Sequence, residues 1–157
     1  MEVNIIGKGP GWELAPHDGE SWGVNDLCLR RNVSVVFDLH EQIETPIRKK
    51  IQNYISKTNV PLVTLDEFPL EKLHSHYCNN SISYMIAYAI EKGYTEINLY
   101  GIFCKRGSEY FDQKPSIEYW IGYARGKGIT VNINEPTSIL KTQNGMMYGY
   151  NIPQDKF

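Results

Sequence analysis

Short apolar runs alternate with longer amphipathic stretches along the chain. The runs are rich in β-branched and aromatic residues and end at glycine or polar residues, a pattern that predicts strands. The expected strands are residues 3–6, 22–25, 33–38, 60–64, 96–100 and 129–133. The third run is almost continuously apolar, which is typical of a strand covered on both faces.

Three stretches between these runs carry apolar residues at steps of three and four, which predicts amphipathic helices over 45–56, 81–92 and 115–127. The first begins with Thr45 before Pro46, a capping residue followed by proline at the first helical position. Its charged residues Arg48, Lys49 and Lys50 are expected to form a solvated basic face.

This alternation predicts an α/β fold: a doubly wound, mainly parallel sheet with helices on both faces. Residues 1–141 are expected to form one domain, followed by a short C-terminal hairpin or arm over 142–157. The arm is suggested by Asn144-Gly145 and the flanking residues Met146, Met147, Tyr148 and Tyr150. Such an aromatic end can pack on its own core or on a second subunit, and we expect a homo-oligomer.

The composition is that of an ordinary globular protein, with 41% hydrophobic and 22% charged residues among 157. A net charge of −2 argues against a partner such as duplex nucleic acid, whose phosphates require a basic face. It is compatible with a local basic patch around a small phosphate ligand. The first residues do not resemble a signal peptide and no apolar run could span a bilayer, so we expect a cytoplasmic protein with no membrane partner.

Cysteine and histidine spacing gives no metal or disulfide pattern. Cys28, Cys78 and Cys104 are odd in number and far apart, without a CxxC pair. His74 and His76 lie two residues apart, with too few further ligands for a metal site, and are expected at the surface. No metal is predicted and no cofactor is firmly implied beyond a nucleotide ligand.

In an open parallel sheet, ligands bind beyond the carboxyl ends of the strands. The first segment expected there is the run Gly7, Lys8, Gly9, Pro10 and Gly11. Its glycines would let the backbone approach a phosphate so that free N–H groups bond the oxygens, and Lys8 adds a positive charge. The run matches neither the dinucleotide fingerprint nor a Walker loop, and a simple tight turn is the alternative.

Two further segments follow the second and third strands. Asn25 and Asp26 would contact a base or ribose, or else cap a helix that begins at Leu27. Asp38 and His40 carry the chemistry for acid–base catalysis or metal binding, with a solvated loop as the alternative.

The remaining candidates surround the second predicted helix and the following strand. Asn80, Ser81 and Ser83 lie at the helix start, where hydroxyl and free N–H groups suit an anion, unless Ser81 is an ordinary N-cap. Beyond the strand that ends at Tyr100 and Gly101, a polar and aromatic loop is expected to line the pocket. Its candidate residues are Arg106, Glu109 and Tyr110.

In combination, these segments resemble a Rossmann-like superfamily. That superfamily includes bacterial sialyltransferases that use CMP-sialic acid and proteins similar to 6-hydroxymethylpterin pyrophosphokinase. The similar segments are residues 5–11, 22–26, 81–85, 93–97, 100–101, 118–129 and 136–140. The last two most resemble small phage and prophage members. The resemblance implies a nucleotide site formed by the first loop, with Asn25 near the base or sugar and Ser81–Ser83 near phosphate.

Three departures from the superfamily bear on activity. Phe103 stands where many relatives have an acidic residue, no histidine base precedes the helix at residues 116–126, and Gly11 replaces a common serine. Loss of positioned proton transfer typically costs about a hundred- to ten-thousand-fold in rate, while binding can persist.

These observations leave three functional hypotheses. The first is a phage-type protein that binds a nucleotide or nucleotide-derived molecule without converting it, in one form sequestering a nucleotide signal of host defence in the host cytoplasm. The second is a small transferase or hydrolase acting on a nucleotide or nucleotide sugar, with Asp38, His40 or Glu109 moving the proton. The third is a structural protein that has kept the fold and lost the ligand.

Overall fold

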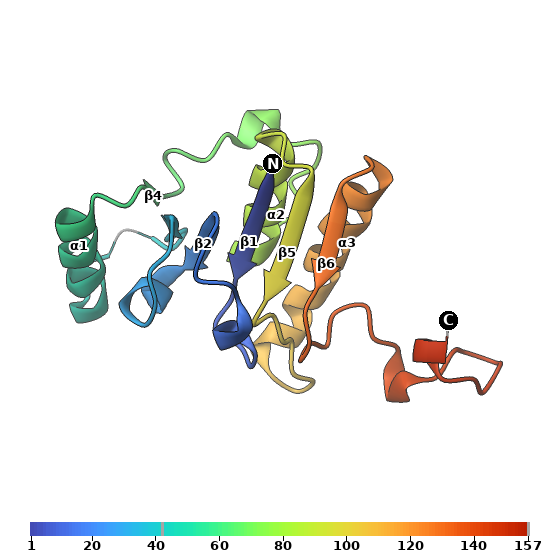
Figure 1. Ribbon diagram of the computed structural model, residues 1–157. Helices are drawn as coiled ribbons and strands as arrows, with labels where there is room; N and C mark the ends of the chain where they lie inside the picture. Colours follow the sequence, from blue (N-terminus) through green and yellow to red (C-terminus); the bar gives the residue numbers. More distant parts are fainter. Residues whose placement is uncertain (42, 157) are drawn as a thin grey trace.

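The computed structural model describes residues 1–41 and 43–156, which fold around one six-stranded parallel sheet (Figure 1). The strand order is β4-β3-β2-β1-β5-β6, and every neighbouring pair is parallel. This confirms the predicted α/β class. The strands are β1 (Glu2–Ile6), β2 (Ser21–Val24), β3 (Val35–Phe37), β4 (Leu62–Val63), β5 (Glu96–Tyr100) and β6 (Thr130–Ile133).

All three predicted helices are present, as α1 (Pro46–Thr58), α2 (Ser81–Glu91) and α3 (Lys114–Gly126). Thr45 caps α1 as predicted, because its Oγ1 accepts a hydrogen bond from the Arg48 N–H at 3.2 Å. The cap of α2 is Asn80 rather than Ser81, since the Asn80 side chain accepts from the Ser83 N–H at 2.9 Å. The described residues also form six short 3₁₀ helices: η1 (Trp12–Leu14), η2 (Asn25–Leu29), η3 (Leu70–Lys72), η4 (Glu109–Gln113), η5 (Gln143–Gly145) and η6 (Gln154–Lys156).

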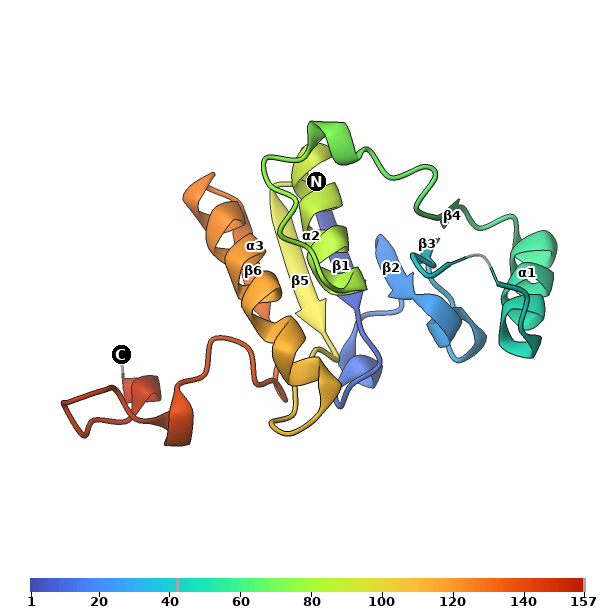
Figure 2. The same cartoon turned by 180° about the vertical axis from the view of Figure 1, so that it is seen from behind.

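Helices α2 and α3 cover one face of the sheet and form the main core with it (Figure 2). On α2 the buried side chains include Met85 and Ile86, and on α3 they include Trp120 and Ile121. They pack against the apolar residues of the strands, among them Leu99, which is 1% exposed. Burial of this apolar surface is the main source of stability.

The opposite face is covered only in part. Over β2, β3 and β4 it is closed by η2 and α1, where Ile51 of α1 packs with Val36 and Cys28. Arg48 of α1 is only 7% exposed, which corrects the expected solvated basic face at this position. Its guanidinium instead binds Asp38 inside the protein, at 2.7 Å.

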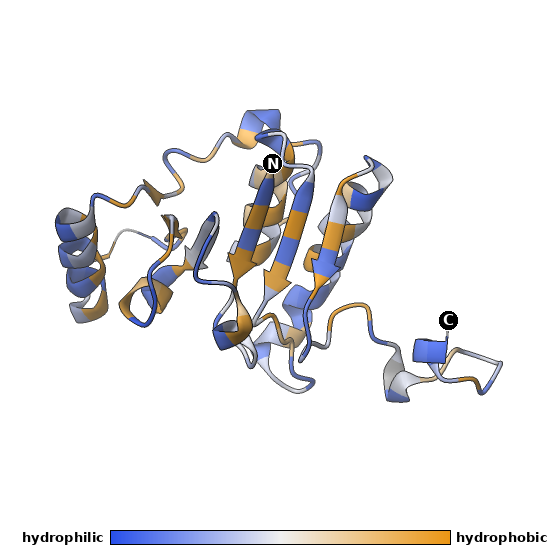
Figure 3. Ribbon diagram, viewed as in Figure 1, coloured by the Kyte–Doolittle hydropathy of each residue, from blue (hydrophilic) through white to orange (hydrophobic). Residues whose placement is uncertain are grey.

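The same face of β1, β5 and β6 carries a row of hydrogen-bonded amides. Asn4, Asn98 and Asn132 are register partners on the three strands. The Asn132 Nδ2 donates to the Asn98 Oδ1 at 2.7 Å, and the Asn98 Nδ2 donates to the Asn4 Oδ1 at 3.3 Å and to Glu2 at 2.7 Å. Figure 3 shows polar and apolar bands alternating along these strands, and none of α1, α2 and α3 lies over this face.

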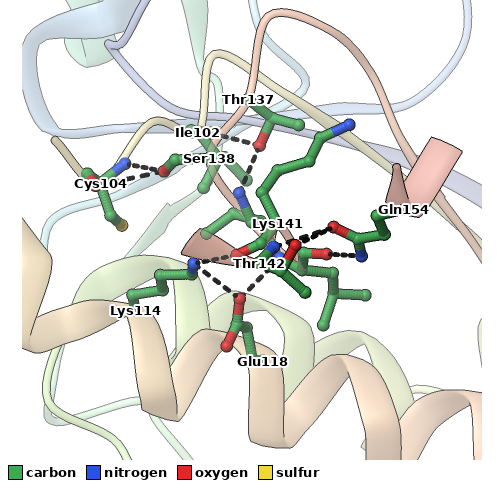
Figure 4. A network of polar contacts seen from close by, with 11 residues as sticks. Ile102, Cys104, Lys114, Glu118, Thr137, Ser138, Lys141, Thr142 and Gln154 are labelled. Atoms are coloured by element: carbon green, nitrogen blue, oxygen red, sulfur yellow. Dashed lines mark hydrogen bonds and ion pairs between the residues drawn. The ribbon is translucent and has the colours of Figure 1, made fainter. Parts of the chain in front are cut away.

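The chain after β6 forms hydrogen bonds with α3 and with the loop after β5 (Figure 4). Glu118 of α3 accepts from the Leu140 N–H at 2.6 Å, and the Ser138 hydroxyl exchanges hydrogen bonds with the Cys104 backbone. Beyond this point an isolated antiparallel bridge joins Met146 to Pro153. Tyr148 is fully exposed, and contact of this end with a second subunit stays a prediction.

None of the described helices is long and apolar enough to cross a membrane.

Candidate functional site

A cleft of about 640 Å³, here called the main cleft, opens at the carboxyl ends of β1, β2, β3 and β5. The chain runs outward from β1 through β2 and β3, then returns to place β5 on the other side of β1. Ligands of open α/β sheets bind at such a reversal of strand order. Ten of the predicted residues line the main cleft: Gly7, Lys8, Gly9, Asn25, His40, Asn80, Ser81, Gly101, Glu109 and Tyr110.

The glycines of the first loop have a structural role that sequence reasoning missed. The Gly7 N–H donates to the Tyr100 carbonyl at 2.9 Å, and the Gly9 N–H donates to the Gly101 carbonyl at 2.8 Å. A Cβ atom on Gly7 would lie 2.5 Å from the Gly101 oxygen. The two loops can therefore lock together only through glycine, and these two N–H groups are already bonded. Within the described residues, the Lys8 N–H has no protein acceptor.

The Lys8 side chain supplies positive charge at the edge of the main cleft. Its Nζ lies 2.7 Å from the Asp26 Oδ1, and Arg30 lies 3.6 Å from the other carboxylate oxygen. Burial alone would raise the pKa of Asp26, but the hydrogen bond and charge of Lys8, helped by Arg30, hold it below its usual value. Asp26 is thus an ion-pair partner of Lys8 and lies outside the main cleft.

Asn25 adopts a left-handed backbone conformation, with φ of 50°, at the point where β2 turns into η2. It does not cap this helix, whose N-cap is Val24. Its Oδ1 is buried and lacks a hydrogen-bond partner among the described residues. Such a group normally finds a partner, so the Asn25 amide is a candidate for a ligand contact.

Asp38, His40 and Arg48 form an array beside the main cleft. Asp38 is 6% exposed and binds Arg48 through Oδ2 at 2.7 Å and His40 Nδ1 through Oδ1 at 3.3 Å. With both oxygens engaged, Asp38 orients its partners, while His40 is the imidazole that lines the cleft. Sequence reasoning had placed Arg48 on the solvent side and so missed its part in the array.

The start of α2 is built by a second amide cluster. The Asn80 Nδ2 donates to the Ser116 Oγ at 2.9 Å, and the Ser116 hydroxyl also bonds Asn79. Ser83 is fully buried and its Oγ donates to the Asn80 carbonyl at 2.8 Å, so it stabilises the helix start. Ser81, in the first turn, lines the main cleft, where N–H groups have no intrahelical acceptor.

Five predicted residues lie outside the walls of both this cleft and the side hollow described below: Pro10, Gly11, Ser83, Tyr100 and Arg106. A Cβ on Gly11 would lie 2.6 Å from Pro136, so this glycine allows the loop after β6 to pack. Tyr100 packs with Ile6 on the other face of the sheet, under η1. Whether any predicted residue binds a ligand stays untested.

The walls also contain residues beyond the individual candidates. Four lie in the segments that were expected to reach the pocket: Asn79, Ile82, Tyr84 and Gln113. The others were not predicted and are apolar or aromatic: Val24, Leu39, Ile102, Phe103, Cys104 and Ile117. Phe103 and Tyr110 are partly exposed, at 38% and 50%, which leaves ring surface available to a ligand. Burial raises the pKa of the Cys104 thiol, which keeps it protonated at neutral pH. Apolar wall residues carry no chemical signal in a sequence, which is why they were missed.

No cluster of three or more histidine, cysteine or acidic residues that could hold a metal ion occurs within residues 1–41 and 43–156. His74 and His76 are exposed as predicted, and His74 stacks on Tyr123 with 4.4 Å between ring centroids.

No protein-family model and no curated protein matches this chain. Among solved structures, thiamine pyrophosphokinase from Bacillus subtilis is similar at a TM-score of 0.55 and 16% identity, over 85% of this chain and 60% of that protein. This chain thus spans less than two thirds of that enzyme. The sialyltransferase CstII from Campylobacter jejuni, in complex with CMP-3FNeuAc, gives a TM-score of 0.47 and 14% identity over 84% of this chain and 79% of that one. The likeness to thiamine pyrophosphokinase shows a shared Rossmann-like fold.

Proposed function

We propose that the main cleft binds a nucleotide or nucleotide-derived small molecule. The observation that supports this is the meeting of two kinds of surface in one cleft. The lining includes the Lys8 ammonium and backbone N–H and the start of α2 at Ser81, which suit phosphate oxygens. It also includes the rings of Tyr84, Phe103 and Tyr110, which suit a planar base. The volume lies within the range of about 300–1,000 Å³ typical of small-molecule sites.

The first form of this proposal is capture without conversion. Asp38 is committed to the buried pair with Arg48, and Glu109 is exposed on η4. Asp38 thus has both oxygens bound by partners, and Glu109 has no hydrogen bond that orients it among the described residues, whereas general acid–base catalysis requires a positioned side chain that is available to the ligand. A protein of this kind would sequester its ligand, and the resemblance to phage members suggests a nucleotide signal of host defence as one such ligand.

A second candidate is a transferase or hydrolase acting on a nucleotide or nucleotide sugar. It is favoured by the His40 array, in which a carboxylate orients an imidazole at the edge of the cleft. An oriented histidine is the commonest general base in enzymes. In this form His40 moves the proton and Asp38 is a positioning residue.

The test is native mass spectrometry of the protein purified from cells, followed by denaturation and identification of any released molecule. Titration with nucleoside mono- and diphosphates then gives affinities for the wild type, Lys8→Met and the control Lys50→Met, an exposed lysine on α1. Loss of a charged hydrogen bond should weaken binding by about 10- to 100-fold in Lys8→Met only.

The same titrations separate the two forms. Intact ligand after prolonged incubation supports capture, while product whose formation falls by about a hundredfold or more in His40→Ala supports catalysis. Absence of binding by every nucleotide tested would contradict both forms and favour the structural hypothesis.

A further inference from the structure

A second hollow, of about 530 Å³, adjoins the main cleft and is here called the side hollow. It lies between η2, the chain after β3 and the start of α1. Lys8, Asn25 and His40 line both hollows. These three side chains form a shared border, so the two hollows are continuous parts of one surface.

The side hollow has an apolar wall. Ile47 and Ile51 lie one turn apart on α1, and Ile43 precedes that helix. Ile43 and Ile47 are 64% and 45% exposed, although both are large aliphatic side chains beside a buried ion pair. Covering them with an organic group would remove apolar surface from water, which is favourable at roughly 25 cal/mol per Å².

The side hollow is lined by two ion pairs and one further carboxylate, that of Glu41. Arg48 is paired with Asp38 and Lys8 with Asp26, each at 2.7 Å. A far group with its own phosphate would compete with Asp38 for Arg48 and be repelled by Glu41, whereas a neutral group leaves the buried Arg48–Asp38 pair intact. Lys8, on the shared border, is half of an exposed pair and can turn to an anion that bridges the hollows.

We propose that the two hollows hold the two ends of one ligand. A nucleoside phosphate occupies the main cleft, its phosphates lie at Lys8 and His40, and a neutral organic group attached to the last phosphate packs on Ile43 and Ile47. This inference rests on the proposed function and narrows it to phosphate-bridged nucleotides. A sugar and a second nucleoside both have the required chemistry for the far group.

Isothermal titration calorimetry can test this with matched series for each of the four bases: the nucleoside monophosphate, the diphosphate and the diphosphate joined to glucose. A dinucleoside diphosphate of the same base, such as diadenosine diphosphate for adenine, serves as the arm with a neutral second nucleoside. Proteins are the wild type, Ile47→Gln and the control Leu65→Gln, an apolar side chain of similar exposure, 42%, outside both hollows. Both changed residues are substantially exposed, so both variants are expected to fold.

For the preferred base, the glucose conjugate or the dinucleoside diphosphate should bind the wild type about tenfold or more tightly than the diphosphate does. Ile47→Gln should lose most of this gain and keep the affinity for the diphosphate within about twofold, while Leu65→Gln should behave as the wild type. Preference for glucose or for the second nucleoside identifies the far group.

Equal affinity for the diphosphate and its conjugates would overturn the two-part ligand and leave the proposed function standing. Absence of binding by every probe would overturn both. If sedimentation shows a wild-type dimer that Ile47→Gln converts to monomer, the isoleucines are covered by a second copy and the proposal is overturned as well.

Discussion

The two halves of the sheet differ in polarity and in helical cover on the face away from α2 and α3. Over β2, β3 and β4, that face is apolar and is covered by η2 and α1 around Val36. Over β1, β5 and β6, it carries the amide row through Asn98. The two halves meet between β2 and β1, and the main cleft opens at the carboxyl ends of strands from both halves.

The difference shows how a parallel sheet can do without a helix on part of one face. Strands covered on both faces are apolar throughout, as β3 is with its sequence VVF. Strands β1 and β5 instead begin EVNI and EINL, in which every second residue is polar. Hydrogen bonds between neighbouring amides then satisfy the polar atoms that a helix would have to bury.

The largest expected effect on stability comes from substitutions on the two faces of β5. Leu99→Ala should destabilise the protein by about 2–5 kcal/mol, because it opens a cavity under α2 and α3. Asn98→Ala, one residue away on the amide face, should cost less, about 1–3 kcal/mol, by leaving Asn4 and Asn132 short of a partner.

Urea unfolding of the two variants gives both free energies. If Asn98→Ala cost as much as Leu99→Ala, the amide row would be as important to stability as the core, and the contrast between the two faces would be wrong.

The next effect concerns the loops after β1 and β5, which pack on each other at the main cleft. Gly101 has φ of 61°, and a Cβ there would lie 2.7 Å from the Trp12 Cβ and 3.0 Å from two carbonyl oxygens. Gly101→Ala should therefore lose about 1–2 kcal/mol for the left-handed backbone and roughly 1–3 kcal/mol more for the overlap.

Gly93→Ala is the matched control, since Gly93 has φ of 79° and nothing within 4 Å of a built Cβ. Thermal unfolding should show only the backbone cost of about 1–2 kcal/mol there. Equal losses in the two variants would mean that the locked loops adjust freely to the added methyl group.

The smallest expected effect on stability at neutral pH concerns Cys28, which is buried where η2 and α1 cover the sheet. Burial raises the pKa of the Cys28 thiol from 9.0 to about 11, so the native state holds this proton more tightly than the unfolded chain does. The free energy of unfolding should be unaffected below pH 9 and should fall as the pH rises from 9 towards 11.

Cys28→Ala removes this contribution, and urea unfolding at several pH values measures it. The wild type should lose more stability than Cys28→Ala between pH 8 and pH 11. Parallel pH profiles of the two proteins would contradict burial of a neutral Cys28 thiol between η2, β3 and α1.

Much of the fold was predictable because it depends on local periodicity. The spacing of Ile82, Met85, Ile86 and Ile90 predicted α2, and the β-branched runs predicted all six strands. The alternation in EVNII and EINLY also contained the polar face, but the expectation of helices on both faces concealed that signal. The candidate site was predicted only where polar residues follow strands.

The sequence by itself determined the elements, their parallel arrangement and the strand ends at which the cleft lies, because these follow from side-chain period and glycine position. Tertiary structure alone decided which groups are already bonded. It committed the Gly7 and Gly9 N–H groups to the β5 loop, turned Arg48 inward onto Asp38, and placed Ile47 across a shared border from the main cleft. Such pairings join residues from separate segments, and only the packed sheet brings those segments within hydrogen-bond distance.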